Sequence, residues 1–324
     1  MRILVYGAGV IGSIFAGKLA ASRQDVTVLA RGKRFEELRS NGIELSAHGV
    51  HRNEIIPVNV IDHLEPDDLF DYIIVAMQRT QVDSVLSILS QNCSRNIVFV
   101  VNTAAGYDQW VQAVGRERLI LGFPSAGGER VDGKVVYFVG KGIVRAFQTT
   151  TFGAYGGRKT ERVRWLINAF RRAGIPSVFC SDMDAWQKTH VAMVTSIGNA
   201  LYQFDCDNYR LARSYDSVKL MVHGIKEGFA VLKKLGIKTK PAKLWYMKLP
   251  AWMTAGVFKM VMGTKLAETA LAKHCVVAKP EMLCLQTEFD SLIEQSQLQT
   301  PAIDRLRKNL LFSENNSNIR EGIS

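Results

Sequence analysis

Three glycines near the N-terminus follow a short apolar run at a spacing suited to binding phosphate. Residues 2–6 predict a buried strand, a helical pattern begins after residue 12, and between them stands the run Gly7-Ala8-Gly9-Val10-Ile11-Gly12. In a strand–turn–helix unit the first glycine makes the tight turn, the second lets backbone N–H groups approach a pyrophosphate, and the third lets the helix pack closely. The helix N-terminus adds partial positive charge. The run predicts a dinucleotide site; the alternative is a turn that binds nothing.

The residues after the second predicted strand indicate which dinucleotide is bound. Residues 26–29 form this strand, and the chain continues with Ala30-Arg31-Gly32-Lys33-Arg34. An NAD site usually places an acidic residue here to hold the ribose 2′-hydroxyl, but the first acid is Glu36. A guanidinium binds a 2′-phosphate that a carboxylate would repel. We therefore predict NADP(H), with Arg31 as the main contact and Lys33 or Arg34 in support; the alternative is a solvated basic turn.

The elements that position these residues alternate in the N-terminal half. Apolar runs rich in β-branched residues predict buried parallel strands at 72–76, 97–101 and 119–123. Residues 135–139 and 143–147 flank a Gly-Lys-Gly sequence and predict a hairpin. A doubly wound, Rossmann-type sheet with an antiparallel extension fits this pattern.

The C-terminal half reads as helical. Residues 161–174 predict a helix that ends at Gly174, and apolar residues then recur at helical spacing over 218–232 and 282–293. The predicted fold class is therefore α/β, a Rossmann-type domain followed by an all-helical domain. We expect an NADP-binding domain over 1–180, a helical substrate and catalytic domain over 181–312, and a disordered tail over 313–324.

The composition of the chain argues against several classes of partner. The chain has 324 residues, 47% hydrophobic content and a net charge of +11, and its basic residues are spread along the sequence rather than gathered in a nucleic-acid module. Five cysteines show no metal spacing, the first strand begins beside Met1, and no apolar run reaches the roughly 20 residues of a membrane span. We expect a cytoplasmic protein with no nucleic-acid, membrane or metal partner. The apolar residues 244–262 offer a contact surface for a homodimer or belong to the core.

The chain resembles the ketopantoate reductases (2-dehydropantoate 2-reductases) over nearly its whole length at a distant level. The resemblance rests on the glycine loop, on Arg31, on Asn102 after an apolar strand, on Trp186-Gln187-Lys188, and on Glu281, 20 residues before Pro301. That family reduces the keto group of ketopantoate with NADPH on the route to pantothenate.

The resemblance implies a role for several residues. Lys188 matches the family lysine that donates a proton to the carbonyl oxygen, a task that suits a cation beside developing negative charge. Asn102 matches a residue near the nicotinamide and substrate, and Glu281 matches a glutamate that contacts the cofactor. Asn102 also has a plainer interpretation, a polar strand-end turn, and Glu281 another, an acid in the first turn of a helix.

The chain also departs from the family pattern, mostly at substrate contacts. Gln78 stands where the family has a lysine near the cofactor, with Arg79 next to it. Ala192 and Ser196 stand where the family places asparagines four and eight residues after the lysine, so Asn199 is the nearest substitute. The family's Asn-Gly-x-Gly and Ser-Ser-Met segments are altered or missing.

The sequence thus predicts an NADPH-dependent reductase of a 2-keto acid, either ketopantoate or a related substrate. Cofactor contacts are expected from residues 7–12, Arg31, Gln78, Asn102 and Glu281. Substrate contacts are expected from Lys188, Ala192, Ser196 and Asn199. The alternative is a non-catalytic NADP(H)-binding protein that senses redox state or binds a partner.

Overall fold

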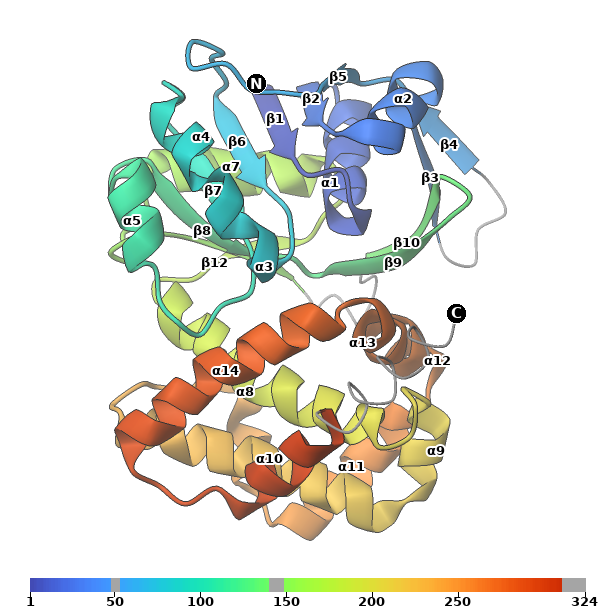
Figure 1. The fold of residues 1–324 in the computed structure, drawn as a ribbon, viewed down its shortest axis with the longest axis vertical. Coiled ribbons are helices and arrows are strands. Elements are labelled where there is room, and N and C mark those ends of the chain that lie inside the picture. Colours follow the sequence, from blue (N-terminus) through green and yellow to red (C-terminus); the bar gives the residue numbers. More distant parts are fainter. Residues whose placement is uncertain (48–52, 140–148, 311–324) are drawn as a thin grey trace, which may run out of the picture. The chain divides into compact units, whose positions relative to one another are not determined.

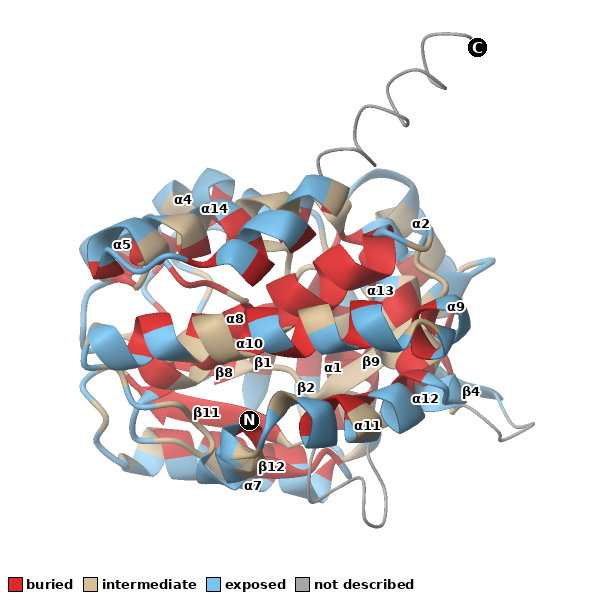
Figure 2. Ribbon diagram, turned by 90° about the horizontal axis from the view of Figure 1, so that it is seen from below, coloured by how far each residue is buried: buried red, intermediate tan, exposed pale blue. Residues whose placement is uncertain are grey.

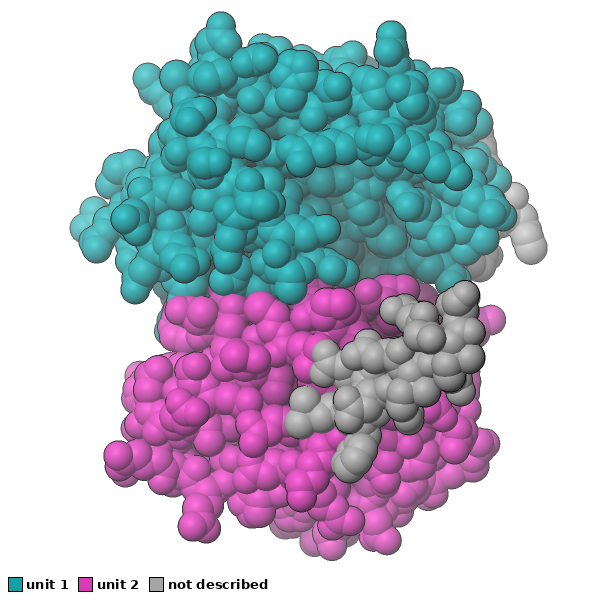
Figure 3. Space-filling view, viewed as in Figure 1, with its two compact units in different colours: residues 1–102, 106–183 teal, residues 103–105, 184–324 magenta. Residues whose placement is uncertain are grey.

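The chain forms two compact units. The computed structural model describes residues 1–47, 53–139 and 149–310. The first unit comprises residues 1–102 and 106–183, and the second comprises 103–105 and 184–324 (Figure 3). The chain therefore leaves the first unit after Asn102, returns to it at Gly106, and leaves it again after Met183. The tail predicted over 313–324 lies outside the described residues.

The first unit is built on one large, mainly parallel sheet (Figure 1). Its strands in spatial order are β12 (Ser177–Phe179), β11 (Thr150–Ala154), β8 (Leu119–Phe123), β7 (Ile97–Val100), β6 (Tyr72–Val75), β1 (Arg2–Tyr6), β2 (Asp25–Leu29) and β5 (Asn59–Ile61). Within this sheet only β8 and β11 pair antiparallel. The predicted doubly wound sheet is confirmed, but its antiparallel strand is β11 and not the predicted strand 135–139, which belongs to a second sheet.

The strand order reverses between β1 and β6. From β1 the chain builds β2 and β5 on one side, then returns to build β6, β7 and β8 on the other. Ligands of such sheets bind at this reversal, beyond the carboxyl ends of the strands.

Helices cover both faces of the sheet because neighbouring residues of β1 point to opposite sides. Ile3 and Val5 belong to one buried cluster, and Leu4 and Tyr6 belong to another. The helices of this unit are α1 (Val10–Ala21), α2 (Gly32–Asn41), α3 (Arg79–Val82), η1 (Asp83–Val85), α4 (Leu86–Gln91), α5 (Asp108–Val114) and α7 (Glu161–Arg172).

A second, four-stranded sheet completes the unit and was not predicted. Its order is β4 (Asn53–Ile56), β3 (Ile43–Ala47), β10 (Lys134–Val139) and β9 (Ala126–Val131). The antiparallel neighbour of β10 is β9, and the two are joined at Asp132 and Gly133, which have φ of 51° and 81°. The hairpin expected after β10 falls on residues 140–148, outside the described residues.

The second unit is helical throughout its described part. Its helices are α8 (Met183–Tyr202), α9 (Asn208–Arg213), α10 (Tyr215–Lys234), η2 (Ala242–Lys248), α11 (Ala251–Met262), α12 (Lys265–Ala267), η3 (Glu268–Ala272), α13 (Lys273–Val277) and α14 (Lys279–Ser296), and residues 301–310 are also helical. The two predicted apolar stripes are the buried faces of α10 and α14 (Figure 2). No helix in the described ranges is both long and apolar enough to cross a bilayer.

Candidate functional site

The three glycines of the turn between β1 and α1 differ in what a side chain would meet at each position. Gly7 has φ of +117°, and a Cβ there would lie 2.5 Å from the carbonyl oxygen of Ala76. A Cβ on Gly12 would lie 1.9 Å from the carbonyl oxygen of Gly7. The fold itself therefore requires these two glycines. Gly9 is exposed, and a Cβ there would meet nothing within 4 Å.

The first backbone N–H groups of α1 are also left without a side-chain cap. Gly9 is its N-cap residue, no side chain caps the helix, and its first turn contains no acidic residue. The remaining predicted positions of the turn, Ala8, Val10 and Ile11, are half-buried. Such a helix start presents backbone N–H groups and the positive end of the helix dipole to an anion. The turn therefore fits the pyrophosphate of a dinucleotide.

Four predicted cofactor positions follow the carboxyl ends of four adjacent strands. In the sheet order β7-β6-β1-β2, Asn102 follows β7, Gln78 follows β6, Gly7 follows β1 and Arg31 follows β2. These strands are parallel, so all four positions lie at one edge of the sheet. The structure thus brings these predicted residues of the first unit together at the strand-order reversal.

Arg31 is exposed at the start of α2. It is the N-cap residue of this helix, and its Nη2 donates a 3.4 Å hydrogen bond to the Tyr6 hydroxyl at the end of β1. Burial raises the pKa of Tyr6, while the charge of Arg31 opposes that rise. Lys33 is also exposed. Both cations are placed where the sequence predicted a 2′-phosphate.

Arg34 forms hydrogen bonds within the protein instead of facing a ligand. Its guanidinium donates to Glu37 Oε2 at 3.1 Å, to the Gly133 carbonyl oxygen at 3.0 Å and to Ser13 Oγ at 3.1 Å. Burial lowers the pKa of Arg34. This side chain ties α2 to α1 and to the β9–β10 turn, so of the two supporting cations Lys33 is the one exposed to a ligand.

The loops after β6 and β7 hold further polar groups. Asn102 Oδ1 is buried without a hydrogen-bond partner among the described residues, and a buried acceptor of this kind calls for a donor. Gln78 is the N-cap residue of α3, but its side chain makes no capping bond. Arg79 donates to Asp83 at 3.0 Å. The Arg79 guanidinium therefore forms an ion pair with Asp83, the first residue of η1.

In the second unit, Lys188 forms an ion pair within α8. Its Nζ lies 2.7 Å from Asp184 Oδ2, one helical turn earlier, and the Lys188 side chain is 14% exposed. The sequence contained the signal for this partner, because an acid four residues before a lysine lies on the same helix face. The ion pair with Asp184 restricts the position of the ammonium group.

His190 lies on the same helix, stacked on Trp186 with ring centroids 5.7 Å apart. Burial lowers its pKa to about 4, and the nearby His274 contributes in the same direction. His190 is therefore neutral at pH 7.

Ala192 and Ser196 lie in the contact between α8 and α10. A Cβ on Gly228 would come within 2.9 Å of Ala192 Cβ, and one on Gly224 within 3.0 Å of Ser196 Oγ. Ser196 Oγ donates to the carbonyl oxygen of Ala192 at 3.1 Å. Both residues are almost fully buried. At these two expected substrate positions, the side chains pack helix against helix.

Asn199 belongs to a buried polar chain. Its Nδ2 donates to Gln286 Oε1 at 2.8 Å, Gln286 donates to Asp290 at 2.8 Å, and Arg307 donates to Asp290 at 2.7 Å. Asn199 Oδ1 has no partner among the described residues. Glu281 is buried in the first turn of α14, seven residues before Glu288.

No local sequence pattern indicates Glu288 as a residue of the site. Its Oε2 accepts hydrogen bonds from Ala104 N at 2.7 Å, Thr103 Oγ1 at 2.9 Å and Ala105 N at 3.3 Å. These three residues come directly after Asn102, whereas Glu288 lies 184 residues beyond Ala104. One carboxylate thus fixes the short segment of the second unit that follows Asn102.

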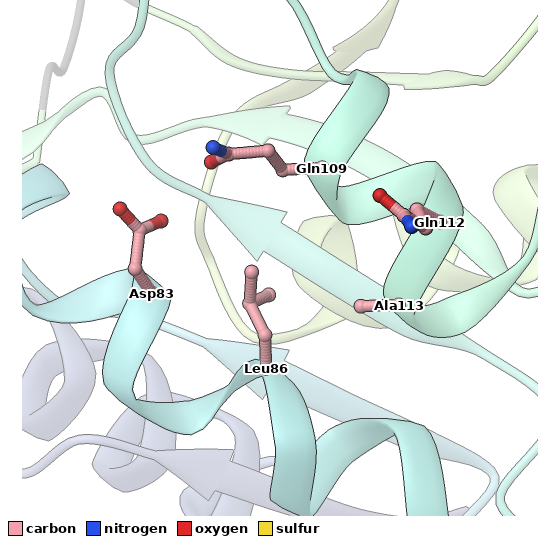
Figure 4. Close-up of a pocket in the computed structure, with 5 residues that line it drawn as sticks. All are labelled: Asp83, Leu86, Gln109, Gln112 and Ala113. Atoms are coloured by element: carbon pink, nitrogen blue, oxygen red, sulfur yellow. The ribbon is translucent and has the colours of Figure 1, made fainter.

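One surface pocket is lined by none of the residues predicted to contact cofactor or substrate. Asp83, Leu86, Gln109, Gln112 and Ala113 line it, from η1, α4 and α5 (Figure 4). Within the described ranges, no group of three or more His, Cys, Asp and Glu residues is placed to hold a metal ion.

The chain is similar to known proteins in sequence. The family model for ketopantoate reductase PanE/ApbA matches residues 3–151. The chain is 29% identical to 2-dehydropantoate 2-reductase of Mesorhizobium japonicum over 58% of this chain and 63% of that protein. It is 24% identical to 2-dehydropantoate 2-reductase of Pyrococcus horikoshii over 74% of this chain and 75% of that protein.

Solved structures share the fold. The 2-dehydropantoate 2-reductase of Geobacter metallireducens superposes with a TM-score of 0.79 and 17% identity, covering 97% of this chain and 100% of that one. D-mandelate dehydrogenase with NADH and anilino(oxo)acetate gives a TM-score of 0.79 and 15% identity, covering 98% and 99%. The family model and these relatives support this chain as a divergent member of the ketopantoate reductase family, and the solved structures show that it shares their fold.

Proposed function

We propose that the protein is an NADPH-dependent reductase of a 2-keto acid. The observation that carries the proposal is the cluster of Gly7, Arg31, Gln78 and Asn102 at one edge of the parallel sheet, at the strand-order reversal. The named relatives support the substrate class, because 2-dehydropantoate and the ligand of D-mandelate dehydrogenase both carry an oxo group beside a carboxyl group.

The cofactor choice rests on charge. Arg31 and Lys33 are exposed after β2, and the acid expected in an NAD site is missing there. Arg31 binds the 2′-phosphate in this proposal, and the open start of α1 binds the pyrophosphate. NADH, which accompanies D-mandelate dehydrogenase, is the competing cofactor.

The chemistry divides between the cofactor and the chain. The reduced nicotinamide supplies the hydride to the keto carbon. Lys188 Nζ donates a proton to the keto oxygen, and its charge stabilises the negative charge that develops there. Asp184 orients the ammonium group through the 2.7 Å ion pair. Asn102 Oδ1, which is buried without a partner among the described residues, would accept a hydrogen bond from the bound cofactor.

The substrate side supports a change of substrate within this class. Ala192 and Ser196 are packed against α10 and offer no amide to a hydroxyl or carboxylate. Each polar partner lost from such a site costs about 1 kcal/mol or more. We therefore expect ketopantoate to be a weaker substrate than another 2-keto acid.

A panel assay tests the proposal. The purified chain is mixed with NADPH or NADH and with ketopantoate, phenylglyoxylate and aliphatic 2-keto acids, and loss of reduced cofactor is followed by absorbance. We expect turnover of at least one acid, faster with NADPH, and loss of turnover in Lys188→Ala. Absence of turnover with every acid would reject the reductase.

A non-catalytic NADP(H)-binding protein is the second candidate. The packing of Ala192 and Ser196 favours it, since it removes two polar contacts from the substrate side. Calorimetry that finds tight NADPH binding without turnover of any acid in the panel would establish this candidate instead.

A further inference from the structure

Helix α11 is apolar on both of its sides. Its buried residues Thr254, Ala255, Phe258 and Met262 face the core of the second unit. Its opposite side is exposed, and Figure 2 shows exposed residues recurring along it. A surface helix normally turns a polar face to water, so this exposed face marks an interaction site.

The exposed side chains are large. They are Trp245 (63%) just before the helix, and Trp252 (63%), Met253 (41%), Val257 (49%), Met260 (69%) and Val261 (43%) within it. The residues from Trp252 to Val261 lie on one half of the helix circumference at 100° per residue. We name the five residues Trp252, Met253, Val257, Met260 and Val261 the α11 apolar face.

The segment of chain that carries this face is basic, while α10, whose Tyr215 hydroxyl donates to the Trp252 carbonyl oxygen, adds the exposed Asp216 nearby. Between Glu227 and Glu268 the chain has eight lysines and no Asp, Glu or Arg. Three of these lysines are exposed at α11: Lys248 before it, Lys259 on it and Lys265 after it. The partner of the face must therefore be apolar at its centre and negatively charged at its rim.

We propose that the α11 apolar face docks the protein on the surface of an anionic lipid bilayer. Tryptophan is favoured at the boundary between headgroups and acyl chains, and lysine stems reach from that depth to lipid phosphates. Met and Val side chains bury into the acyl region, and the lysines are attracted to anionic headgroups. This proposal departs from the expectation from sequence of no membrane partner, which was drawn from the lack of an apolar run long enough to span a bilayer; docking on the surface requires no such run.

Two other occupants fit the face less well. A second copy in a symmetric dimer would bring Lys248, Lys259 and Lys265 toward the same lysines of its partner, with like charges facing each other. Nucleic acid would use the lysines and stack on the two tryptophans, but it gives no burial to Met253, Val257, Met260 and Val261. A bilayer uses the apolar and the charged groups together.

Vesicle binding tests the proposal with the full chain. Co-sedimentation is measured with vesicles of phosphatidylcholine alone and of phosphatidylcholine with phosphatidylglycerol, and tryptophan emission is recorded in both. We expect binding and a blue shift only with the anionic vesicles, and a decrease in binding as salt increases. Lys259→Glu with Lys265→Glu should weaken binding at least roughly 30-fold, the change given by about 1 kcal/mol per lysine.

Matched variants separate docking from folding. Val257→Glu with Met260→Glu should abolish binding, while Trp165→Glu, at another exposed tryptophan (57%) on α7, should leave it unchanged. Thermal unfolding checks that all variants fold. Failure of the wild-type chain to bind anionic vesicles at low salt would overturn the proposal, as would a dimer in solution that Val257→Glu with Met260→Glu dissociates while vesicle binding persists.

Discussion

Glu288 Oε2 accepts a hydrogen bond from the backbone N–H of Ala104 at 2.7 Å, and the same oxygen accepts two more, from Thr103 and Ala105. Hydrogen bonds to a carboxylate are stronger than those between neutral groups. The three bonds fix the peptide that follows Asn102. They link a residue of the proposed cofactor site to α14 through the backbone.

Glu288→Ala should therefore lower kcat about tenfold, because Asn102 loses the support of the segment that follows it. Glu288→Gln retains an acceptor oxygen and should recover most of that loss. Steady-state kinetics of the two variants measure the difference.

Glu227→Ala is the matched control. Glu227 accepts three hydrogen bonds from the backbone of Ala302 and Ile303, away from Asn102 in the sequence. Both alanine variants should lose on the order of 1–3 kcal/mol of stability in urea unfolding. Equal kcat losses in Glu288→Ala and Glu227→Ala would show that Glu288 serves stability alone.

The glycine turn predicts two opposite outcomes. Gly12→Ala should destabilise the protein by more than about 3 kcal/mol, because its Cβ would overlap the Gly7 carbonyl oxygen at 1.9 Å. Gly9→Ala meets no protein atom within 4 Å and should change stability by less than about 0.5 kcal/mol. Its methyl group would instead weaken NADPH binding about tenfold or more. Thermal unfolding and calorimetry separate the two effects, and unchanged NADPH affinity in Gly9→Ala would argue against pyrophosphate binding at this turn.

Arg31→Ala tests the cofactor choice. Removing a charged partner of the 2′-phosphate should weaken NADPH binding about 10- to 100-fold and leave NADH binding unchanged. Arg34→Ala should have the opposite pattern. It loses the hydrogen bonds to Ser13, Glu37 and Gly133, so the protein should be less stable, while the ratio of NADPH affinity to NADH affinity stays the same. A ratio that moves equally in both variants would contradict the assignment to Arg31.

Lys188→Ala should lower kcat by about 10² to 10⁴, the range for loss of a general acid. Asp184→Asn keeps the shape of the partner but removes its charge, so we expect a smaller decrease with folding intact. Pre-steady-state measurement of the hydride step in both variants checks the order. Full activity of Lys188→Ala would remove the lysine from the mechanism.

His190 gives stability a pH dependence. Its pKa is lowered by burial to about 4 from the ordinary 6.5, so the folded state binds its proton more weakly than the unfolded state. The stabilisation is complete above about pH 6.5 and is lost progressively as the pH falls toward 4. We expect a loss on the order of 1 kcal/mol between pH 7 and pH 5. Urea unfolding of wild type and His190→Gln at both pH values measures it, and an identical pH slope in the two proteins would refute this origin.

The five central strands of the large sheet, β1, β2, β6, β7 and β8, were predictable because they carry their own signal, whereas β5, β11 and β12 were not predicted. The runs at β6, β7 and β8 are β-branched and buried on both faces, so the local sequence decides the structure. The small sheet lacked that signal. β4 is mostly exposed and β9 half-buried, and what holds them is pairing with β3 and β10.

The candidate site divides in the same manner. The glycine turn and Arg31 depend on residues that are close in sequence, and their positions at the sheet edge follow from the strand order. The hydrogen bond from Arg34 to Gly133 joins residues 99 positions apart in the sequence. The packing of Ala192 on Gly228 depends on which face of α8 contacts α10. Such contacts exist only once the chain has folded, so no local pattern contains them.

The path of the chain at residues 102–106 limits how the protein can be divided. A fragment ending near residue 180 would retain Thr103, Ala104 and Ala105 but lose the carboxylate that accepts their hydrogen bonds. We therefore expect the N-terminal half to lose the structure of this segment when it is expressed alone or exchanged between relatives. A chimera that carries a foreign helical half must also supply an acceptor where Glu288 now stands.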